Sequence, residues 1–281
     1  LDAAILFSDI LTIPDALDMD LTFIPNLGPK ISKSITQPQD ISNLPFHEAP
    51  EKLTYVYEAV KDLRSALGNR LPLIGFSGSP WSLACYMISG RNHNHFQLTK
   101  QFAYQHPVAT SDLIEKLATL TSSYLIEQAK SGADILFLID TWGGILPSSQ
   151  YQHYVLKPLT YIQQQLKKEN LDTPILFYSK GFRQHHQQIL VDSNCHHGLA
   201  LDWTVDLGKT YQALHNSLAI QGNLDPCILL AGPLATQQHT SRMLDAVNPQ
   251  SGYIASLGHG ILPETPIESV HAFIDSVHNH Q

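Results

Sequence analysis

The sequence has 281 residues, of which 43% are hydrophobic and 15% are charged, and this composition is typical of a folded globular chain rather than a disordered one. The formal net charge is −8, which argues against nucleic acid or an anionic membrane surface as a partner, because both would repel the chain. Every apolar run is shorter than a membrane-spanning segment, so we expect no membrane partner.

The three cysteines, at positions 85, 195 and 227, form no CxxC pair and leave an odd thiol. Such usage indicates a reducing compartment, and we expect a cytoplasmic location. The sequence starts at Leu1 with neither a basic stretch nor a signal-peptide cleavage pattern, and it enters an apolar run almost at once. We therefore expect that a preceding segment is absent from this sequence.

Seven short apolar runs have the length and continuous apolarity of parallel strands that are buried on both faces. In chain order they are Ala3–Ser8, Pro72–Ser77, Asp134–Asp140, Pro174–Ser179, Gly198–Asp202, Leu218–Gln221 and Tyr253–Leu257. Amphipathic patterns with helical spacing occur between them. They cover residues 48–67, 111–131, 149–168, 206–217, 236–247 and 266–279.

This alternation of strands and helices predicts an α/β fold with a parallel sheet. An eight-stranded (β/α) TIM-type barrel whose first βα unit is missing explains both the seven units and the abrupt start. A doubly wound open sheet is the alternative, but it gives no reason for the polar residues that follow so many strands. Since no low-complexity linker divides the chain, we predict a single barrel domain over residues 1–281 that is incomplete at its N-terminus.

Barrel enzymes carry their reacting groups at the C-terminal ends of the strands. Acidic, hydroxyl, basic and imidazole groups follow the predicted strands here. They are Ser8-Asp9, Ser77-Gly78-Ser79, Asp140-Thr141, Ser179-Lys180, Asp202, Gln221-Gly222-Asn223 and Gly258-His259-Gly260. Any one of them is a weak signal, but together they predict one active site.

Six segments in this sequence resemble motifs of the uroporphyrinogen decarboxylases, in the same order and spacing. They are FSDILTIPDAL (7–17), GFSGSPWSLACYMISG (75–90), DTWGG (140–144), LDWTVDL (201–207), QGNLDP (221–226) and LGHGILPETP (257–266). The resemblance runs from residue 1 to the end. It implies a cofactor-free carboxy-lyase, usually a homodimer, that removes the four acetate carboxyl groups of uroporphyrinogen III to give coproporphyrinogen III in haem and related tetrapyrrole biosynthesis.

The chemistry requires an electron sink, and a pyrrole that is protonated on a ring carbon provides one within the substrate. The protein then has to stabilise a cationic ring, for which a placed carboxylate is suited. Asp9 matches the central aspartate of the family in the FSDIL segment, so the resemblance implies that Asp9 is catalytic. The alternative is that Asp9 only caps a helix.

The resemblance also implies that Tyr86, Thr141 and His259 bind the substrate, since they match positions that hydrogen-bond its carboxylates or lie beside its rings. Each can donate a hydrogen bond to a carboxylate. Each also has a structural alternative: the tyrosine could only pack, the threonine could only cap the next segment, and the histidine could only support the GHG turn.

Two departures from the family pattern stand out. A segment resembling RQAGRY, whose arginines are expected to bind propionates, would lie before Leu1 and is not in this sequence. Residues 91–95, Arg-Asn-His-Asn-His, stand where the family tends to have glycine. The missing cations predict that this chain alone is inactive.

Histidine is abundant, notably at His185-His186 and in Cys195-His196-His197, but adjacent ligands rarely chelate one ion well. No nucleotide-binding glycine pattern occurs either, so we expect no metal and no organic cofactor. Two alternatives remain open. One is a zinc- and corrinoid-linked methyltransferase of the same superfamily, which would need His and Cys ligands after the late strands. The other is an inactive tetrapyrrole-binding homologue.

Overall fold

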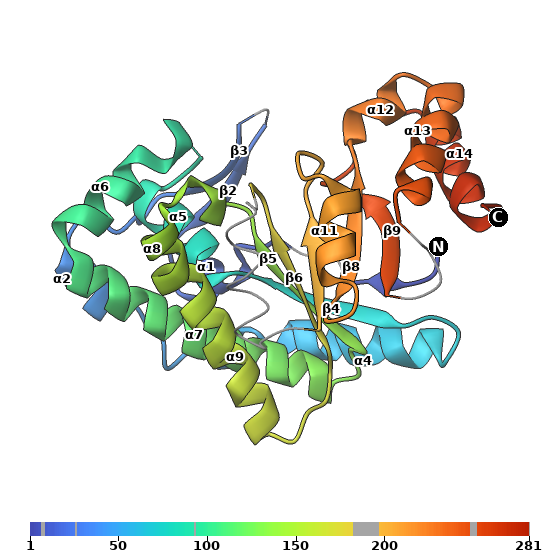
Figure 1. The fold of residues 1–281 in the computed structure, drawn as a ribbon. Helices are drawn as coiled ribbons and strands as arrows, with labels where there is room; N and C mark the ends of the chain where they lie inside the picture. The colour runs from blue at the N-terminus through green and yellow to red at the C-terminus, as the bar shows by residue number, and fades with distance from the viewer. Residues whose placement is uncertain (7–8, 26, 93, 182–196, 248–251, 281) are drawn as a thin grey trace. The chain divides into compact units, whose positions relative to one another are not determined.

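The structure is a computed structural model that describes residues 1–6, 9–25, 27–92, 94–181, 197–247 and 252–280. The chain divides into two compact units, Asp2–Ile175 and Leu176–Gln281, and Leu1 is grouped with the second. In both units parallel strands alternate with helices along the chain (Figure 1).

The first unit contains three parallel strands in the order β1 (Ala4–Ile5), β4 (Leu73–Gly78) and β5 (Ile135–Asp140). An antiparallel hairpin of β2 (Leu21–Ile24) and β3 (Gly28–Ile31) follows the first helix. The helical segments are α1 (Thr12–Ala16), α2 (Pro38–Ser42), α3 (Ala49–Lys52), α4 (Thr54–Leu67), α5 (Pro80–Ser89), η1 (Asn94–Phe96), α6 (Gln97–Gln105), α7 (Pro107–Lys130), η2 (Gly143–Ile145), α8 (Ser148–Tyr151), η3 (Gln152–Leu156) and α9 (Lys157–Lys168).

The second unit contains four parallel strands in the order β6 (Ile175–Ser179), β7 (Gly198–Leu201), β8 (Ala219–Leu224) and β9 (Tyr253–Leu257). Every residue of β6 and β7 is buried, as expected for strands that are covered on both faces. The helices are α11 (Leu207–Leu214), α12 (Pro226–Leu230), α13 (Pro233–Asp245) and α14 (Ile267–His278).

Helix α5 is buried on all sides, and its local sequence defines both of its ends. The Ser79 hydroxyl caps the first turn by accepting the Ser82 N–H at 3.2 Å. Pro80 occupies the first helical position, where its missing N–H costs nothing. Gly90 ends the helix with a φ of 73°, a left-handed conformation that favours glycine. The helix is thereby held rigidly at the C-terminal side of β4.

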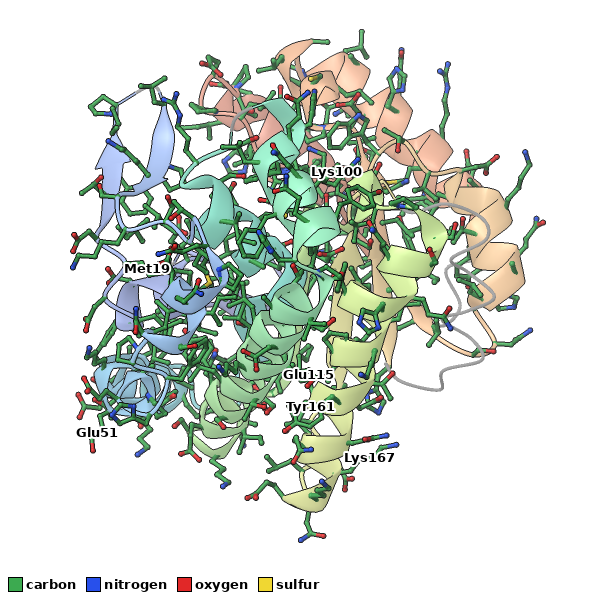
Figure 2. All side chains as sticks on the ribbon, turned by 90° about the vertical axis from the view of Figure 1, so that its left-hand side faces the viewer. Met19, Glu51, Lys100, Glu115, Tyr161 and Lys167 are labelled. Carbon is green, nitrogen blue, oxygen red and sulfur yellow. The ribbon has the colours of Figure 1, made fainter. Side chains whose placement is uncertain are left out.

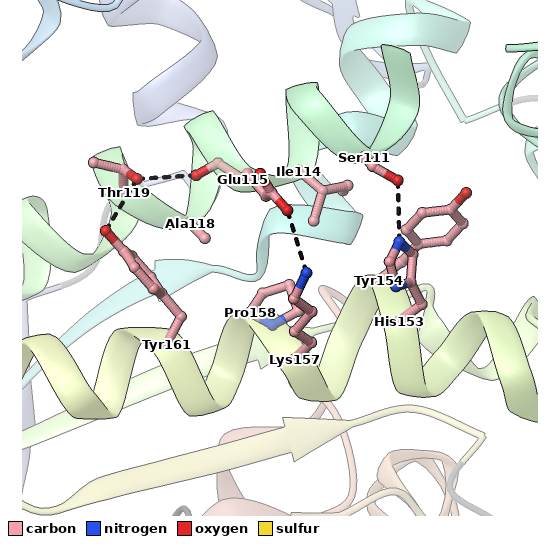
Figure 3. A pocket seen from close by; sticks show the side chains of 10 residues that line it. All are labelled: Ser111, Ile114, Glu115, Ala118, Thr119, His153, Tyr154, Lys157, Pro158 and Tyr161. Atoms are coloured by element: carbon pink, nitrogen blue, oxygen red, sulfur yellow. Dashed lines mark hydrogen bonds and ion pairs between the residues drawn. The ribbon is translucent and has the colours of Figure 1, made fainter. Parts of the chain in front are cut away.

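Helix α7 runs beside η3 and α9, and three polar side-chain pairs join it to them (Figure 3; the wider view is Figure 2). The pairs are Ser111 with His153 at 3.0 Å, Glu115 with Lys157 at 3.2 Å, and Thr119 with Tyr161 at 3.3 Å. Successive members lie four residues apart on each helix, so they share one face. Beneath them Ile114, Ala118 and Pro158 line a pocket of about 320 Å³.

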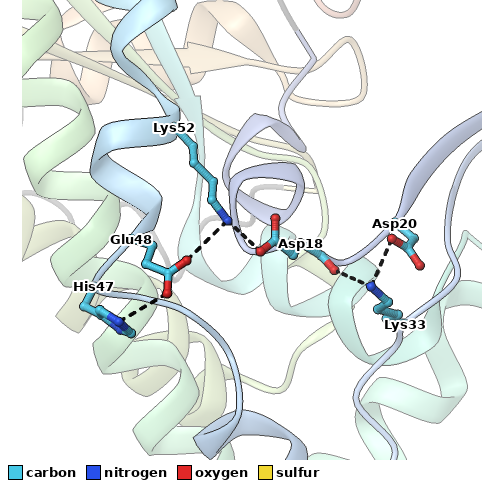
Figure 4. Close-up of polar contacts among 6 residues, drawn as sticks. All are labelled: Asp18, Asp20, Lys33, His47, Glu48 and Lys52. Atoms are coloured by element: carbon cyan, nitrogen blue, oxygen red, sulfur yellow. Dashed lines mark hydrogen bonds and ion pairs between the residues drawn. The ribbon is translucent and has the colours of Figure 1, made fainter.

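Exposed charges connect the loop after α1 to the hairpin and to α3 (Figure 4). Lys52 Nζ lies 2.6 Å from Asp18 Oδ2 and 3.7 Å from Glu48 Oε2. Lys33 Nζ lies 3.1 Å from Asp20 Oδ1. Because these groups are solvated, each pair adds little to stability, about 0–1 kcal/mol.

The structure confirms the predicted parallel α/β organisation. All seven predicted strands are present, although β1 is shorter than the predicted run and positions 7 and 8 lie outside the described residues. The predicted helix over 48–67 is divided into α3 and α4, and that over 149–168 contains the π-helical turn η3. The hairpin and helices α1, α2, α5, α6 and α12 were not predicted.

Within the part of the chain that the structure describes, no helix is both long enough and apolar enough to cross a membrane.

Candidate active site

Asp9 lies between the end of β1 and the start of α1, in the first unit. Its Oδ1 accepts the Leu11 N–H at 2.7 Å, and its backbone carbonyl accepts the Thr12 hydroxyl at 2.6 Å. Partial burial raises the pKa of Asp9, and the hydrogen bond from Leu11 opposes that rise. The helix-capping role predicted as the alternative is not formed, because the N-cap residue of α1 is Leu11 and no side chain caps this helix. The Asp9 carboxylate instead holds the backbone just before the helix, and it uses one oxygen to do so.

Tyr86 is buried on α5, where its ring contacts Phe96 edge-to-face with the ring centroids 5.1 Å apart. The Phe96 ring in turn meets the Trp142 ring at 4.8 Å. Burial raises the pKa of the Tyr86 hydroxyl, the nearby polar group of the Trp142 side chain lowers it, and the charge of Asp9 raises it further. The structure therefore brings Asp9, Tyr86 and Trp142 into one neighbourhood.

Thr141 follows the last residue of β5 and is half-buried. Its backbone N–H donates to the Ser82 hydroxyl at 3.0 Å. At the end of the adjacent strand, Gly78 permits close approach of the Asp9–Ile10 segment, since a Cβ there would lie 3.2 Å from the Ile10 carbonyl oxygen. Three of the predicted site residues thus gather at the C-terminal ends of β4 and β5, as expected for a barrel enzyme.

His259 lies in the second unit, just after β9. Its Nδ1 accepts the Gly260 N–H at 2.7 Å, so the neutral imidazole carries its proton on Nε2 and can donate from that side. Its ring packs edge-to-face against Tyr178 and Trp203, with centroid distances of 6.2 and 5.8 Å. Desolvation by these surroundings lowers the pKa of His259, the charge of Lys180 lowers it further, and Asp202 opposes both.

A basic group lies beside this histidine. Lys180 follows β6 and places its Nζ 5.3 Å from the centre of the Trp203 ring. Asp202, which is 1% exposed, accepts the Gly181 N–H at 2.6 Å and the Thr204 N–H at 2.7 Å. The buried carboxylate thereby fixes the loops after β6 and β7, which carry the lysine and the tryptophan.

The sequence analysis predicted Asp9, Tyr86, Thr141 and His259 as site residues but assigned no role to the tryptophans at 142 and 203. The signal that could have found them is their position, because each comes within two residues of a strand end. Asp140 and Asp202 were noted only as polar strand ends, and the structure shows that both accept hydrogen bonds that organise loops.

Within the described ranges, no group of three or more His, Cys, Asp or Glu side chains could hold a metal ion. Of the clusters singled out in the sequence, His185-His186 and the first two residues of Cys195-His196-His197 lie outside those ranges, and His197 is described. Cys85 is buried, which raises the pKa of its thiol well above the ordinary value, and Asp140 adds to that rise. A thiol held neutral in this way is a poor metal ligand.

Comparison with known proteins decides the family. The family profile described as uroporphyrinogen decarboxylase (URO-D) matches residues 1–280. The uroporphyrinogen decarboxylase of Coxiella burnetii (strain RSA 493 / Nine Mile phase I) is 42% identical over 281 residues, which cover 99% of this chain and 77% of that protein. The chain belongs to the uroporphyrinogen decarboxylase family.

Other members of the uroporphyrinogen decarboxylase family give the same result. The proteins of that name from Legionella pneumophila (strain Lens) and Saccharophagus degradans are 40% and 41% identical, and each match covers 99% of this chain and 78% of the relative. Among solved structures, a methyltransferase from Methanosarcina mazei matches 98% of this chain and 80% of its own, with a TM-score of 0.76 and 15% identity. At that identity the likeness shows the fold alone. The predicted α/β fold of the TIM-barrel type is thereby confirmed.

Proposed function

We propose that this protein is a carboxy-lyase that converts uroporphyrinogen III to coproporphyrinogen III by removing the four acetate carboxyl groups. Membership of the uroporphyrinogen decarboxylase family supports the reaction. The observation that carries the assignment to this site is the half-buried Asp9 carboxyl group beside Tyr86 and Trp142. A carboxylate in such a partly desolvated place interacts strongly with a developing positive charge.

In the proposed step a proton adds to a ring carbon of one pyrrole, which makes that ring cationic. The bond between the acetate methylene and its carboxyl carbon then breaks, and its electron pair moves into the ring as CO₂ leaves. A second proton converts the exocyclic methylene to a methyl group, and the first proton then leaves the ring carbon, which restores the neutral aromatic pyrrole. Asp9 stabilises the cationic ring through the pyrrole N–H groups, since its second carboxylate oxygen is not used by the bond from Leu11.

The other groups have the chemistry to hold the carboxylates of the substrate. Tyr86 and Thr141 offer hydroxyl groups, His259 offers a neutral Nε2–H, and Lys180 adds a positive charge. The structure adds Lys180 to the predicted residues, because its Nζ lies over the Trp203 ring and that ring packs against His259. We assign these four residues to substrate binding.

We also propose that the protein works as a cytoplasmic homodimer whose subunit is one barrel domain over residues 1–281. Resemblance to the family supports the dimer, and the odd cysteine count supports the compartment. Light scattering after gel filtration measures the assembly. For this chain a dimer has twice the mass of 31.2 kDa, and a mass of 31.2 kDa would contradict the proposal.

The test of the function is product analysis. Because the chain alone is predicted to be inactive, the protein is purified as the product of its complete reading frame. It is incubated with uroporphyrinogen III under reducing conditions, and the products are oxidised and separated by their number of carboxyl groups. We expect coproporphyrinogen to accumulate through partly decarboxylated intermediates. A folded protein that binds the substrate without releasing CO₂ would instead favour the inactive homologue. Methyl transfer from a methyl-corrinoid to a thiol would favour the methyltransferase.

A further inference from the structure

The hydroxyl group of Ser82 lies where α5 meets the segment that follows β5. It donates to Asp140 Oδ1 at 3.0 Å, and it accepts the backbone N–H groups of Thr141 at 3.0 Å and Trp142 at 3.3 Å. A serine hydroxyl has one donor and two acceptor sites, so these three bonds use its full capacity. Ser82 is 0% exposed, so water cannot replace a lost bond without entering the core.

Neighbouring side chains hold the same segment from other directions. Trp81 Nε1 donates to the Trp142 carbonyl at 3.1 Å, and the Ser79 hydroxyl donates to Asp140 Oδ1 at 2.6 Å. Lys100, on α6, donates to the Ile145 carbonyl at 3.3 Å. The segment from residue 140 to residue 145 is therefore fixed at both ends.

Gly143 adds a steric condition to this arrangement. A Cβ at this position would lie 2.0 Å from Asp140 Oδ2 and 2.9 Å from the Tyr151 ring. The backbone thus passes as close to the buried carboxylate as a residue without a side chain allows. Such an approach is possible only if the carboxylate itself is held in place, which is what the hydroxyls of Ser79 and Ser82 do.

The same helix carries Tyr86, one turn after Ser82. Residues four apart on a helix lie on one face, so α5 presents a hydroxyl that holds Thr141 and, next to it, a phenol ring that packs on Phe96, which in turn contacts Trp142. The relative positions of Tyr86 and Thr141 are therefore set by one rigid helix through one buried hydroxyl group.

We propose that Ser82 is a positioning residue of the decarboxylase, which holds Thr141 at the place where it meets a carboxylate of the substrate. The inference rests on the proposed function for its effect on turnover. The structural effect of Ser82, which is to keep the backbone of residues 141–145 well ordered, does not depend on that function. A hydroxyl that only satisfies the core would support folding without controlling this segment.

The test compares Ser82→Thr with Ser82→Val. Threonine and valine have nearly the same shape, so both variants carry the same extra methyl group and differ only in the hydroxyl. Ser122→Ala is the control, because Ser122 is a buried serine of the same unit whose hydroxyl bonds to the Thr119 carbonyl at 2.8 Å, on α7. The readouts are the thermal midpoint, hydrogen exchange of the 141–145 backbone, and KM and kcat for uroporphyrinogen III.

We expect Ser82→Val to speed exchange at residues 141–145 and to raise KM roughly ten- to hundredfold, in line with the cost of a displaced substrate-binding group. Ser82→Thr should stay close to the wild type in its exchange rate at residues 141–145 and in its KM. Ser122→Ala should change neither the exchange rate nor KM. If the valine variant fails to fold, Ser82→Ala takes its place with the same expectations. If the threonine and valine variants have the same rate of hydrogen exchange at residues 141–145 and the same KM, the proposal is overturned. A wild-type protein without decarboxylase activity would contradict the proposed function, and the exchange comparison would still decide the positioning role.

Discussion

Gly260 donates its backbone N–H to Nδ1 of His259 over 2.7 Å. A nitrogen that accepts a hydrogen bond carries no proton, so this contact holds the histidine neutral with its proton on Nε2. The nearby charge of Lys180 favours the same neutral form. The ring is thereby prepared to donate a hydrogen bond at neutral pH.

The first prediction concerns the titration of His259. We expect its pKa to lie below the ordinary value near 6.5, chiefly because of desolvation. Lys180→Met should raise the pKa, since removal of a positive charge makes protonation easier, while desolvation still keeps it below the ordinary value. NMR titration of the ring protons measures both. Lys209→Met, which removes an exposed lysine of the same unit, is the control and should leave the pKa unchanged.

The second prediction concerns Asp9. In Asp9→Asn the side-chain oxygen still accepts the Leu11 N–H, so the fold should be kept while the negative charge is lost. We expect the turnover rate to fall roughly 10²-fold or more, the usual cost of losing a group that stabilises a transition-state charge. Stopped product assays measure the rate. Asp62→Asn, at an exposed site on α4, should remain active, and near-normal turnover by Asp9→Asn would remove Asp9 from the mechanism.

The pH profile provides a third prediction. Burial raises the pKa of Asp9, so its carboxylate is protonated at a higher pH than an exposed aspartate. Activity that needs the ionised form should therefore decline, as the pH falls, before an ordinary aspartate would titrate. Measurement of kcat at saturating substrate isolates this group from binding effects. If kcat declines at low pH in Asp9→Asn as it does in the wild type, the decline is caused by another residue.

A fourth prediction concerns metal ions. The electron sink belongs to the substrate, and the described part of the chain offers no cluster of metal ligands. Dialysis against a strong chelator should therefore leave the decarboxylation rate unchanged. Loss of activity that zinc restores would support the methyltransferase-like alternative, and metal analysis of the active protein is an independent check.

A fifth prediction concerns the polar pairs between α7 and α9. The Glu115 and Lys157 side chains are 67% and 62% exposed, so water screens their charges. A double-mutant cycle with Glu115→Gln and Lys157→Gln should give a coupling of about 1 kcal/mol or less in the free energy of unfolding. That coupling should shrink further in high salt. A larger, salt-resistant value would mean that the pair is better shielded from water than its exposure indicates.

Several features could be predicted because their signals are local. Continuous apolar runs such as those of β6 and β7 identify strands that are buried on both faces. The polar residues that follow the strands lie at the edge where barrel enzymes usually carry their active site. Helix α5 was missed for a physical reason. It is buried all round, so its sequence lacks the apolar and polar faces on which a periodicity argument depends.

The sequence by itself determined the α/β organisation, the family and the identity of the groups that can donate to a carboxylate, because these depend on residue type and order. Only the tertiary structure decided the hydrogen-bond partners of each group, its burial and the charges that act on its pKa. Ser82 bonds to residues about 60 positions away, the pKa of Tyr86 responds to Asp9 and Trp142, and that of His259 responds to Lys180. Burial and charge proximity are sums over neighbours that are distant in the chain, and no local pattern encodes them.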